Sequence, residues 1–365
     1  MSYLVCSANF SYPDMQKIPF EVIPLKQWFL RHKRDFPWRG EPTPYEVWIS
    51  EVMLQQTQAT VVIDYFHRWM DRFPHLHALA EARLEEVLKM WEGLGYYSRA
   101  RRLHAAAHYF VMHHQGQIPN QRTELEKVAG LGPYTIGAIL SFAFHQRTAA
   151  VDGNVLRVLA RYFGIAEDSS TSKVRQHIAQ LAERLLPEEE PWLITEGLIE
   201  LGALVCTRVP QCLQCPLKNG CIAHQTGQEL ELPIKKQAAK VTELNRQVMV
   251  IHAEDEVLVR KGTAGRVMAD LYEFPYAEIR SDELILYMDT QFPFPRIFEK
   301  HLRPQTHSFT RYKARLIPSL WKALEKRPVE SYDWMPWKKI RQLPFSAGHR
   351  RILTSLIEEH AHFTH

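Results

Sequence analysis

Residues 125–139 read LEKVAGLGPYTIGAI, which is a Gly-x-Gly turn between two short helical segments. Pro133 predicts the first turn of the second helix, because proline is favoured at that position. In such a hairpin the backbone N–H groups from Gly130 to Gly132 and the positive end of the next helix point to one place, which suits a phosphate group. A plain helix–helix turn has the same pattern, so the neighbouring segments must decide between the two interpretations.

The surrounding stretch, about residues 20–225, carries helical patterns throughout. Thr43 and Glu46 predict a capping box at one helix start, and Thr123 and Glu126 predict another. Stop signals recur and no strand alternation persists, so this part is predicted to be all-α. Shortly after the Gly-x-Gly turn, Asp152 stands just before a further predicted helix start.

Four of the five cysteines lie close together, with the spacing C-x5-C-x2-C-x5-C, at Cys206, Cys212, Cys215 and Cys221. Disulfides are disfavoured because the chain is long and otherwise nearly free of cysteine. Four thiolates suit either tetrahedral zinc or a [4Fe–4S] cluster. Zinc ribbons usually pair two C-x2-C knuckles, and only one is present here, so the spacing favours an iron–sulfur cluster.

The character of the chain changes after about residue 225. Residues 226–245 are polar and basic without a lasting apolar period, and they predict an interdomain linker. Residues 246–365 are predicted to form an α+β domain. Its predicted strands are 248–251, 257–259 and 314–320, and its predicted helices are 282–288 and 350–360.

Composition sets outer limits on the function. The 365 residues suggest about two domains, and 45% hydrophobic residues give each a normal core. The net charge of +4 fits a nucleic-acid binder without requiring one. No apolar run approaches the roughly 20 residues of a membrane span, and the beginning of the sequence lacks the features of a signal peptide. A thiolate-bound cluster suits a reducing compartment, so an intracellular protein is expected.

Residues 20–225 resemble the helix-hairpin-helix DNA glycosylases of the endonuclease III superfamily, and within it the adenine DNA glycosylases of the MutY type. The following segments, in this order, carry the resemblance: PWRGEPTPYEVWISEVMLQQTQ (37–58), GLGYYSRARRLH (93–104), AGLGPYTIGAI (129–139), AVDGNVLRVLAR (150–161) and ELGALVCTRVPQCLQCPLKNGC (200–221). The resemblance implies a helix-hairpin-helix glycosylase domain with a [4Fe–4S] loop.

The resemblance also implies catalytic roles. Glu51 matches the general acid that protonates the leaving adenine, and burial in an apolar helix would raise its pKa. Asp152 matches the carboxylate that supports the cationic sugar, and Asn154 helps to hold that aspartate or the attacking water. Tyr134 occupies the position where bifunctional relatives carry a lysine, so no Schiff base can form there. A monofunctional glycosylase is expected.

Further positions match DNA-contacting residues of this family. Trp38, Arg39, Leu54, Tyr134 and Glu196 match the lining of the adenine pocket. Gln56 and Tyr96 match residues that wedge into the duplex opposite the flipped base, and the hairpin glycines Gly130 and Gly132 match its phosphate contact. Arg99 is predicted to face the phosphate backbone.

The carboxy-terminal half resembles the nudix-like domain of MutY enzymes through VLVRKGTAGRVMADLYEFP (257–275) and LPFSAGHRRIL (343–353). The acidic metal-binding helix of nudix hydrolases is absent after Pro275, so no nudix hydrolase activity is expected of this domain. In the family this domain reads 8-oxoguanine through a Phe-Ser-His loop, which corresponds here to Phe309, Thr310 and Arg311. The sequence also departs from the family in the first cysteine interval, which has five residues where six are usual.

The expected function is removal of adenine mispaired with 8-oxoguanine or guanine in base excision repair, by a cytoplasmic, nucleoid-associated bacterial monomer acting on double-stranded DNA. A thymine-mismatch or oxidised-pyrimidine glycosylase is the alternative within the superfamily. A non-catalytic iron–sulfur DNA-binding protein is the alternative of another class, but such a protein would not need Glu51 together with Asp152.

Overall fold

The computed structural model describes residues 20–235, 241–263, 268–309 and 312–359. The contacts between residues divide the chain into two compact units, which are described separately. The first contains the described residues up to 52 together with 118–235. The second contains 53–117 together with the described residues from 241 onward.

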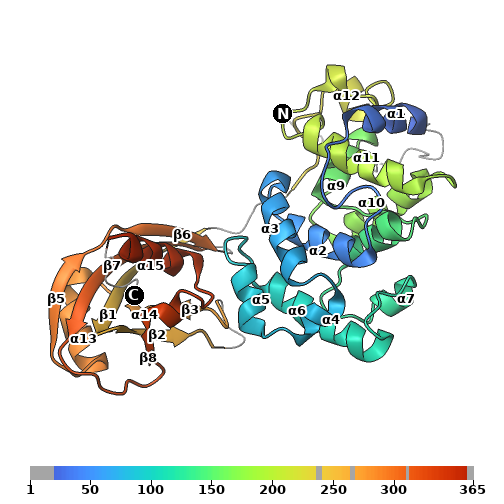
Figure 1. Ribbon diagram of the computed structural model, residues 1–365. Helices are drawn as coiled ribbons and strands as arrows, with labels where there is room; N and C mark the ends of the chain where they lie inside the picture. The colour runs from blue at the N-terminus through green and yellow to red at the C-terminus, as the bar shows by residue number, and fades with distance from the viewer. Residues whose placement is uncertain (1–19, 236–240, 264–267, 310–311, 360–365) are drawn as a thin grey trace, which may run out of the picture. The chain divides into compact units, whose positions relative to one another are not determined.

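The first unit is helical (Figure 1). Its elements are α1 (Val22–His32), most of α2 (Pro44–Leu54), α7 (Arg122–Leu125), α8 (Pro133–Ala138), the π-helical turn η2 (Ile139–Ala143), α9 (Gly153–Tyr162), α10 (Ser172–Leu185), α11 (Pro191–Leu204), η3 (Cys212–Gln214) and α12 (Ile222–Thr226). The apolar helix α11 packs against α1 and α9. A Cβ at Gly202 of α11 would lie 2.5 Å from the Cβ of Asn154, so glycine permits the close approach of α11 and α9.

Local sequence signals explain several helix starts in this unit. Thr43 and Glu46 form the predicted capping box: the Thr43 N–H donates to Glu46 Oε2 at 2.7 Å, and the Glu46 N–H donates to Thr43 Oγ1 at 3.2 Å. Pro133 opens α8 as predicted. The second predicted capping box is wrong, because α7 begins at Arg122 and Thr123 therefore lies inside the helix.

The helical part of the second unit contains α3 (Ala59–Arg72), α4 (Leu76–Glu81), α5 (Leu84–Met90) and α6 (Ser98–His114). Its core includes three large aromatic side chains that are fully buried. The ring of Trp69 meets those of Phe73 and Trp91 edge to face, with centroids 5.0 and 5.5 Å apart. Such pairs add to the gain from burying large apolar surfaces.

The rest of the second unit is an eight-stranded mixed sheet with helices on both faces. Its elements are β1 (Thr242–Ala253), β2 (Glu256–Lys261), β3 (Tyr272–Glu273), β4 (Tyr276–Ala277), η4 (Ser281–Glu283), α13 (Leu284–Gln291), β5 (Arg296–His301), β6 (Gln305–Phe309), β7 (Tyr312–Ala323), β8 (Asp333–Pro336), α14 (Trp337–Ile340) and α15 (Ala347–Glu359). The main path is β3-β2-β1-β7-β5, and β1 pairs with β7 in parallel.

Strand β1 shows how this sheet is covered on both faces. Val248 and Val250 belong to the cluster that includes α14 and α15, whereas Met249 and Ile251 belong to the cluster that includes α13. Because alternate side chains face opposite sides of a sheet, a strand buried on both faces carries a continuous apolar run. The predicted α+β class is confirmed for this part of the chain.

The predicted linker is partly folded. Strand β1 begins at Thr242, within the predicted linker. Before it, the carbonyl of Leu232 accepts a hydrogen bond from Arg161 Nε at 2.9 Å, and the carbonyl of Ile234 accepts from the Ser169 N–H at 2.9 Å. Residues 232–234 are therefore tied to the first unit. Within the described parts of the chain, no helix combines the length and apolar character that crossing a membrane requires.

Candidate active site and cysteine loop

Glu51 and Tyr134 form a buried pair in the first unit. Helix α2 buries Glu51 among apolar neighbours in sequence, and its side chain is nearly inaccessible to water. Tyr134, in the first turn of α8, donates its hydroxyl hydrogen to Glu51 Oε2. The hairpin proline and the capping box of α2 thus fix the two ends of one hydrogen bond.

Burial raises the pKa of Glu51 to about 7, even though the Tyr134 hydrogen bond acts in the opposite direction. The negative charges of Asp152 and Glu196 raise this pKa further, and the positive charge of Arg39 lowers it. Burial, together with the nearby carboxylates, also holds the pKa of Tyr134 well above its usual range. Glu51 can therefore carry a proton near neutral pH, and Tyr134 remains a hydrogen-bond donor.

Asp152 is the N-cap of α9. Its Oδ1 accepts hydrogen bonds from the backbone N–H groups of Asn154 and Val155, both at 2.8 Å, and its Oδ2 accepts from Asn154 Nδ2 at 2.8 Å. Burial raises the pKa of Asp152, and these hydrogen bonds act against that rise because they favour the charged form. The two carboxyl groups thus have different surroundings. Glu51 accepts one hydrogen bond from a tyrosine hydroxyl, whereas Asp152 accepts three hydrogen bonds from amide N–H groups.

Arg157 joins Asn154 to the cysteine loop, and the sequence interpretation did not identify it. Its Nη2 donates to Asn154 Oδ1 and to the carbonyl of Gly202, both at 2.8 Å, and its Nε donates to the carbonyl of Cys206 at 2.7 Å. Arg157 follows Asn154 by three positions on α9, so helical spacing places the two side chains on one face. This spacing could have identified the contact between Arg157 and Asn154. The carbonyls of Gly202 and Cys206 lie more than 40 positions along the chain, so nothing in the sequence pointed to them.

Of the residues predicted for the adenine pocket, Arg39 is ion-paired, whereas Trp38 and Leu54 are apolar. Arg39 contacts Glu196 (Nε to Oε1, 3.4 Å) and Glu200 (Nη2 to Oε2, 2.8 Å). Trp38 is buried and stacks on Phe36 with ring centroids 4.9 Å apart. Leu54, half-buried, ends α2 three positions after Glu51.

The two glutamates held by Arg39 have opposite pKa shifts. Burial raises the pKa of Glu196, and Arg39 only partly offsets this. Burial also disfavours the charge of Glu200, but hydrogen bonds from Arg34 and Arg39 outweigh it, so the pKa of Glu200 lies below its usual range. Glu200, fully buried and paired with both arginines, is a second residue that the sequence interpretation missed.

The four cysteines of the loop are free thiols. Burial raises the pKa of Cys215 to about 12, and the proximity of the other three thiols contributes to this rise. Cys206 Sγ accepts a hydrogen bond from Arg161 Nη1 at 3.3 Å. The described loop therefore gathers four sulfur donors beside a buried arginine.

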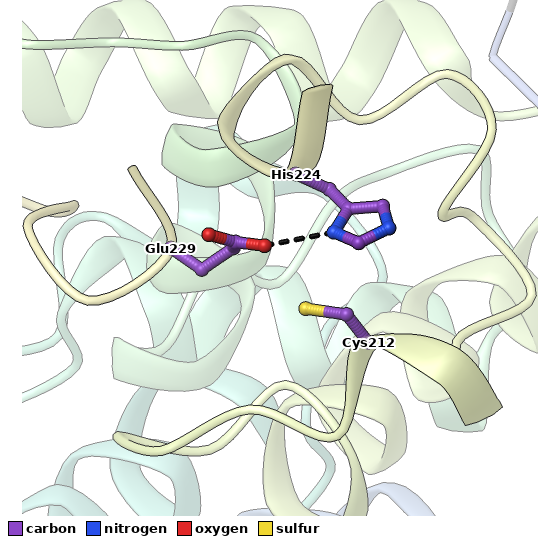
Figure 2. A group of neighbouring side chains, drawn as sticks. All are labelled: Cys212, His224 and Glu229. Atoms are coloured by element: carbon purple, nitrogen blue, oxygen red, sulfur yellow. Dashed lines mark hydrogen bonds and ion pairs between the residues drawn. The ribbon is translucent and has the colours of Figure 1, made fainter. Parts of the chain in front are cut away.

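Figure 2 shows a smaller group, formed by Cys212 of this loop, His224 of α12 and Glu229, which follows α12. The ligand atoms of the three residues lie within 4.8 Å of one another, and His224 Nδ1 forms a hydrogen bond with Glu229 Oε1 at 2.7 Å. The sequence interpretation identified Cys212 but neither of its neighbours. His224 and Glu229 thus form a hydrogen-bonded polar pair beside the thiol of Cys212.

The hairpin has the predicted local geometry. Gly130 adopts a φ of 98°, a conformation that L-amino acids with side chains rarely take. Gly132 is the N-cap of α8, and a Cβ there would meet no atom within 4 Å. Only Gly130 is required by backbone geometry.

In the second unit, the predicted phosphate-facing role of Arg99 is wrong. Its side chain is buried, and its guanidinium donates to backbone carbonyls at the end of α2, in the loop after α2 and in the loop between α5 and α6. The predicted wedge residues Gln56 and Tyr96 are exposed and lie in these loops. Phe309 ends β6 and pairs with Tyr312 of β7, whereas the predicted lesion-reading residues Thr310 and Arg311 lie outside the described residues.

Comparison with known proteins defines the class first. Residues 49–184 match the model of the HhH-GPD superfamily of base excision DNA repair proteins, and residues 247–355 match that of the NUDIX domain. The fold is also similar to a thermostable thymine-DNA glycosylase of known structure (26% identity, TM-score 0.51, covering 56% of this chain and 95% of that one). The two-part fold class predicted from the sequence is thereby confirmed.

Relatives then define the family. The adenine DNA glycosylase of Buchnera aphidicola subsp. Schizaphis graminum (strain Sg) is 31% identical over 304 residues, which cover 82% of this chain and 87% of that protein. The chain belongs to the adenine DNA glycosylase family. The adenine DNA glycosylase of Rattus norvegicus is 46% identical over 211 residues, which cover 55% of this chain. That match spans only 41% of the length of the rat protein.

Proposed function

We propose that this protein hydrolyses the N-glycosidic bond of adenine mispaired with 8-oxoguanine or guanine in double-stranded DNA. The observation that carries this proposal is the buried Glu51, with a pKa of about 7, bonded to Tyr134 and influenced by the charge of Asp152. Adenine is a poor leaving group unless it is protonated, and a general acid is most effective when its pKa lies near the working pH.

In the proposed mechanism the adenine nucleotide leaves the base stack, because the scissile bond is inaccessible within the duplex. Glu51 gives its proton to the leaving base, and Tyr134 holds the carboxyl group in place. Asp152 supports the developing positive charge on the sugar, following the division of work between two carboxyl groups in glycoside hydrolysis. Asn154 orients Asp152 through its Nδ2 hydrogen bond.

The proposal includes a monofunctional reaction. Strand cleavage by β-elimination requires an amine that forms a Schiff base with the sugar. Tyr134 supplies a hydroxyl group at the hairpin position, and its raised pKa keeps that group protonated and engaged with Glu51. The product would be an abasic site in an intact strand.

We assign the adenine pocket to Glu196, Arg39, Trp38 and Leu54. Glu196 can accept a hydrogen bond from the exocyclic amine of adenine, and Arg39 orients it through their ion pair. The gathered thiols of Cys206, Cys212, Cys215 and Cys221 fit a [4Fe–4S] cluster, which would order the loop around a basic surface. Zinc in place of about four irons per chain, after anaerobic purification, would contradict this assignment.

We further propose a monomer that acts on DNA in the bacterial nucleoid, with a glycosylase domain at 20–225, a linker at 226–245 and a nudix-like lesion-reading domain at 246–365. The NUDIX match over 247–355 supports the third of these. Phe309, Thr310 and Arg311 are the proposed lesion-reading residues, because they correspond in sequence to the Phe-Ser-His loop of the family.

The test is base release from duplexes with adenine opposite 8-oxoguanine, guanine or cytosine, measured with and without alkali. Adenine release from the first two, with strand breaks only after alkali, is the expected result. Release of thymine from a T:G duplex instead would favour the alternative within the superfamily. Binding of all duplexes without any base release would favour a non-catalytic DNA-binding protein.

A further inference from the structure

Two loops of the second unit share an unusual backbone conformation. The loop between α2 and α3 contains Gln56 with a φ of 58°, and the loop between α5 and α6 contains Tyr96 with a φ of 47°. Residues other than glycine persist in this left-handed region only where the surrounding structure fixes them. Both side chains are exposed, and Tyr96 has 46% of its surface accessible. Contacts with the buried interior must therefore hold the backbones of Gln56 and Tyr96 in this conformation.

The guanidinium group of Arg99 binds both loops. Its Nη1 donates to the carbonyls of Met53 at 3.0 Å and Gln55 at 2.7 Å. Its Nη2 donates to the carbonyls of Leu94 at 3.0 Å and Gly95 at 3.2 Å. Nη1 thus binds the last turn of α2 and the loop that follows it, and Nη2 binds the loop between α5 and α6.

Two of the four acceptors, the carbonyls of Gln55 and Gly95, each belong to the residue just before an exposed side chain. Gln55 directly precedes Gln56, and Gly95 directly precedes Tyr96. The carbonyl of Gly95 also accepts a hydrogen bond from Trp91 Nε1 at 3.1 Å. The peptide unit before each of the two left-handed residues is therefore fixed to the same guanidinium.

Arg99 suits this task through its burial and its shape. Only 7% of the residue is exposed, so solvent competes little for its hydrogen bonds. Burial lowers the pKa of Arg99 to about 10, which still leaves the group charged at neutral pH. The planar fork can reach two loops at once, whereas a lysine ammonium is a single point with three donors.

We propose that Arg99 is a positioning residue that holds Gln56 and Tyr96 as one rigid pair for insertion into the duplex. This inference rests on the proposed function and on the wedge role that the family resemblance implies for Gln56 and Tyr96. The rigid pair matters when the adenine must be separated from a partner base and from its stacking neighbours. It matters less when the adenine has no partner, because unpairing then costs little.

The experiment uses the full chain with the substitution Arg99→Lys, and Arg296→Lys as the matched control. Arg296 is also shielded from solvent, and its Nη1 donates to the carbonyls of Phe292 at 2.9 Å and Phe294 at 3.3 Å. Single-turnover adenine release is measured on an A:G duplex and on a duplex with adenine opposite a tetrahydrofuran abasic-site analogue. Fluorescence of 2-aminopurine beside the adenine reports unstacking.

Arg99→Lys is expected to slow release from A:G by about 10- to 100-fold, since misplacing a positioning group by about 1 Å can cost two orders of magnitude. The fluorescence rise should fall in parallel. Adenine release opposite the tetrahydrofuran residue should fall by less than about 3-fold. Arg296→Lys should match the wild type on both duplexes. Adding Arg99→Lys to Tyr96→Ala should have a smaller effect than in the wild type, because residues that act together are not additive.

Equal losses on both duplexes, or no loss on A:G, would overturn the proposal. If Arg99→Lys does not fold, Gly95→Ala tests the same link, since Gly95 has a φ of 70° that alanine resists, and its carbonyl would move. A wild-type rate for Gly95→Ala on A:G would equally overturn it. Failure of the proposed function looks different: the wild-type chain then releases no adenine from either duplex.

Discussion

Burial has opposite consequences for Glu51, which is bonded to Tyr134 in the first unit, and for Arg99, which binds backbone carbonyls in the second. At Glu51, burial acts on a titratable side chain and raises its pKa to about 7, so the side chain itself can do chemistry. At Arg99, burial protects a permanent charge that binds four backbone carbonyls, and the exposed neighbours Gln56 and Tyr96 would contact DNA. Reactivity is tuned in the first region, and geometry is fixed in the second.

The largest expected effect separates these two tasks. Glu51→Gln removes the proton donor, so we expect adenine release to fall by roughly 10²- to 10⁴-fold, the usual contribution of a general acid. Duplex binding and 2-aminopurine unstacking should remain near the wild-type level, which is the reverse of the Arg99→Lys pattern. Glu46→Gln on the same helix is the control, because glutamine preserves a capping box. Wild-type release rates for Glu51→Gln would remove Glu51 from the mechanism.

The pH dependence of stability gives the next largest effect. The folded-state pKa of Glu51 is raised, so its contribution to stability is fully present below pH 4.5 and is lost as pH rises through about 7. By linkage, the free energy of unfolding of the wild type should fall by roughly 2–4 kcal/mol relative to Glu51→Gln between pH 4.5 and 8. Denaturant unfolding at both pH values measures this difference.

Arg99→Lys serves as the counterpart in that experiment. Its destabilisation should be the same at both pH values, because Arg99 stays charged throughout the range. A pH-independent difference between the wild type and Glu51→Gln would mean that Glu51 titrates as an ordinary exposed carboxyl group.

The smallest expected effect adds a third region to the comparison. If the carboxy-terminal domain reads the lesion, Thr310→Ala should cost about 1 kcal/mol in discrimination between A:8-oxoguanine and A:G, the scale of one neutral hydrogen bond. Arg311→Ala should weaken binding of both duplexes alike and reduce the salt dependence. Duplex titrations at two salt concentrations measure both quantities. Equal effects of Thr310→Ala on both duplexes would place lesion reading elsewhere.

Local chemistry explains what could be predicted from the sequence. The capping box at Thr43, the start of α8 at Pro133 and the N-terminal place of Asp152 on α9 depend on residues within one turn. An acid within an apolar helix predicts a raised pKa for Glu51, and the structure shows the burial that raises it. The strands β1, β2 and β7 carry apolar runs and were also predicted, with shorter bounds.

What could not be predicted depends on contacts between distant segments. In sequence Arg99 cannot be told from Arg102, which is exposed, and only contacts with backbone carbonyls of other segments decide that Arg99 is buried. Glu200 is paired with arginines more than 160 positions away along the chain. The parallel pairing of β1 with β7 likewise joins strands separated by most of the domain.

The central claim is that a protonated Glu51 delivers the proton to adenine. It is tested most directly by the pH dependence of single-turnover adenine release from an A:G duplex. The account predicts that the rate is sustained below pH 7 and falls about tenfold per pH unit above the Glu51 pKa, because only the protonated acid is active. A drop at acidic pH is expected where Asp152, with its raised pKa, becomes protonated. A rate that rises steadily from pH 6 to pH 9 would contradict the account.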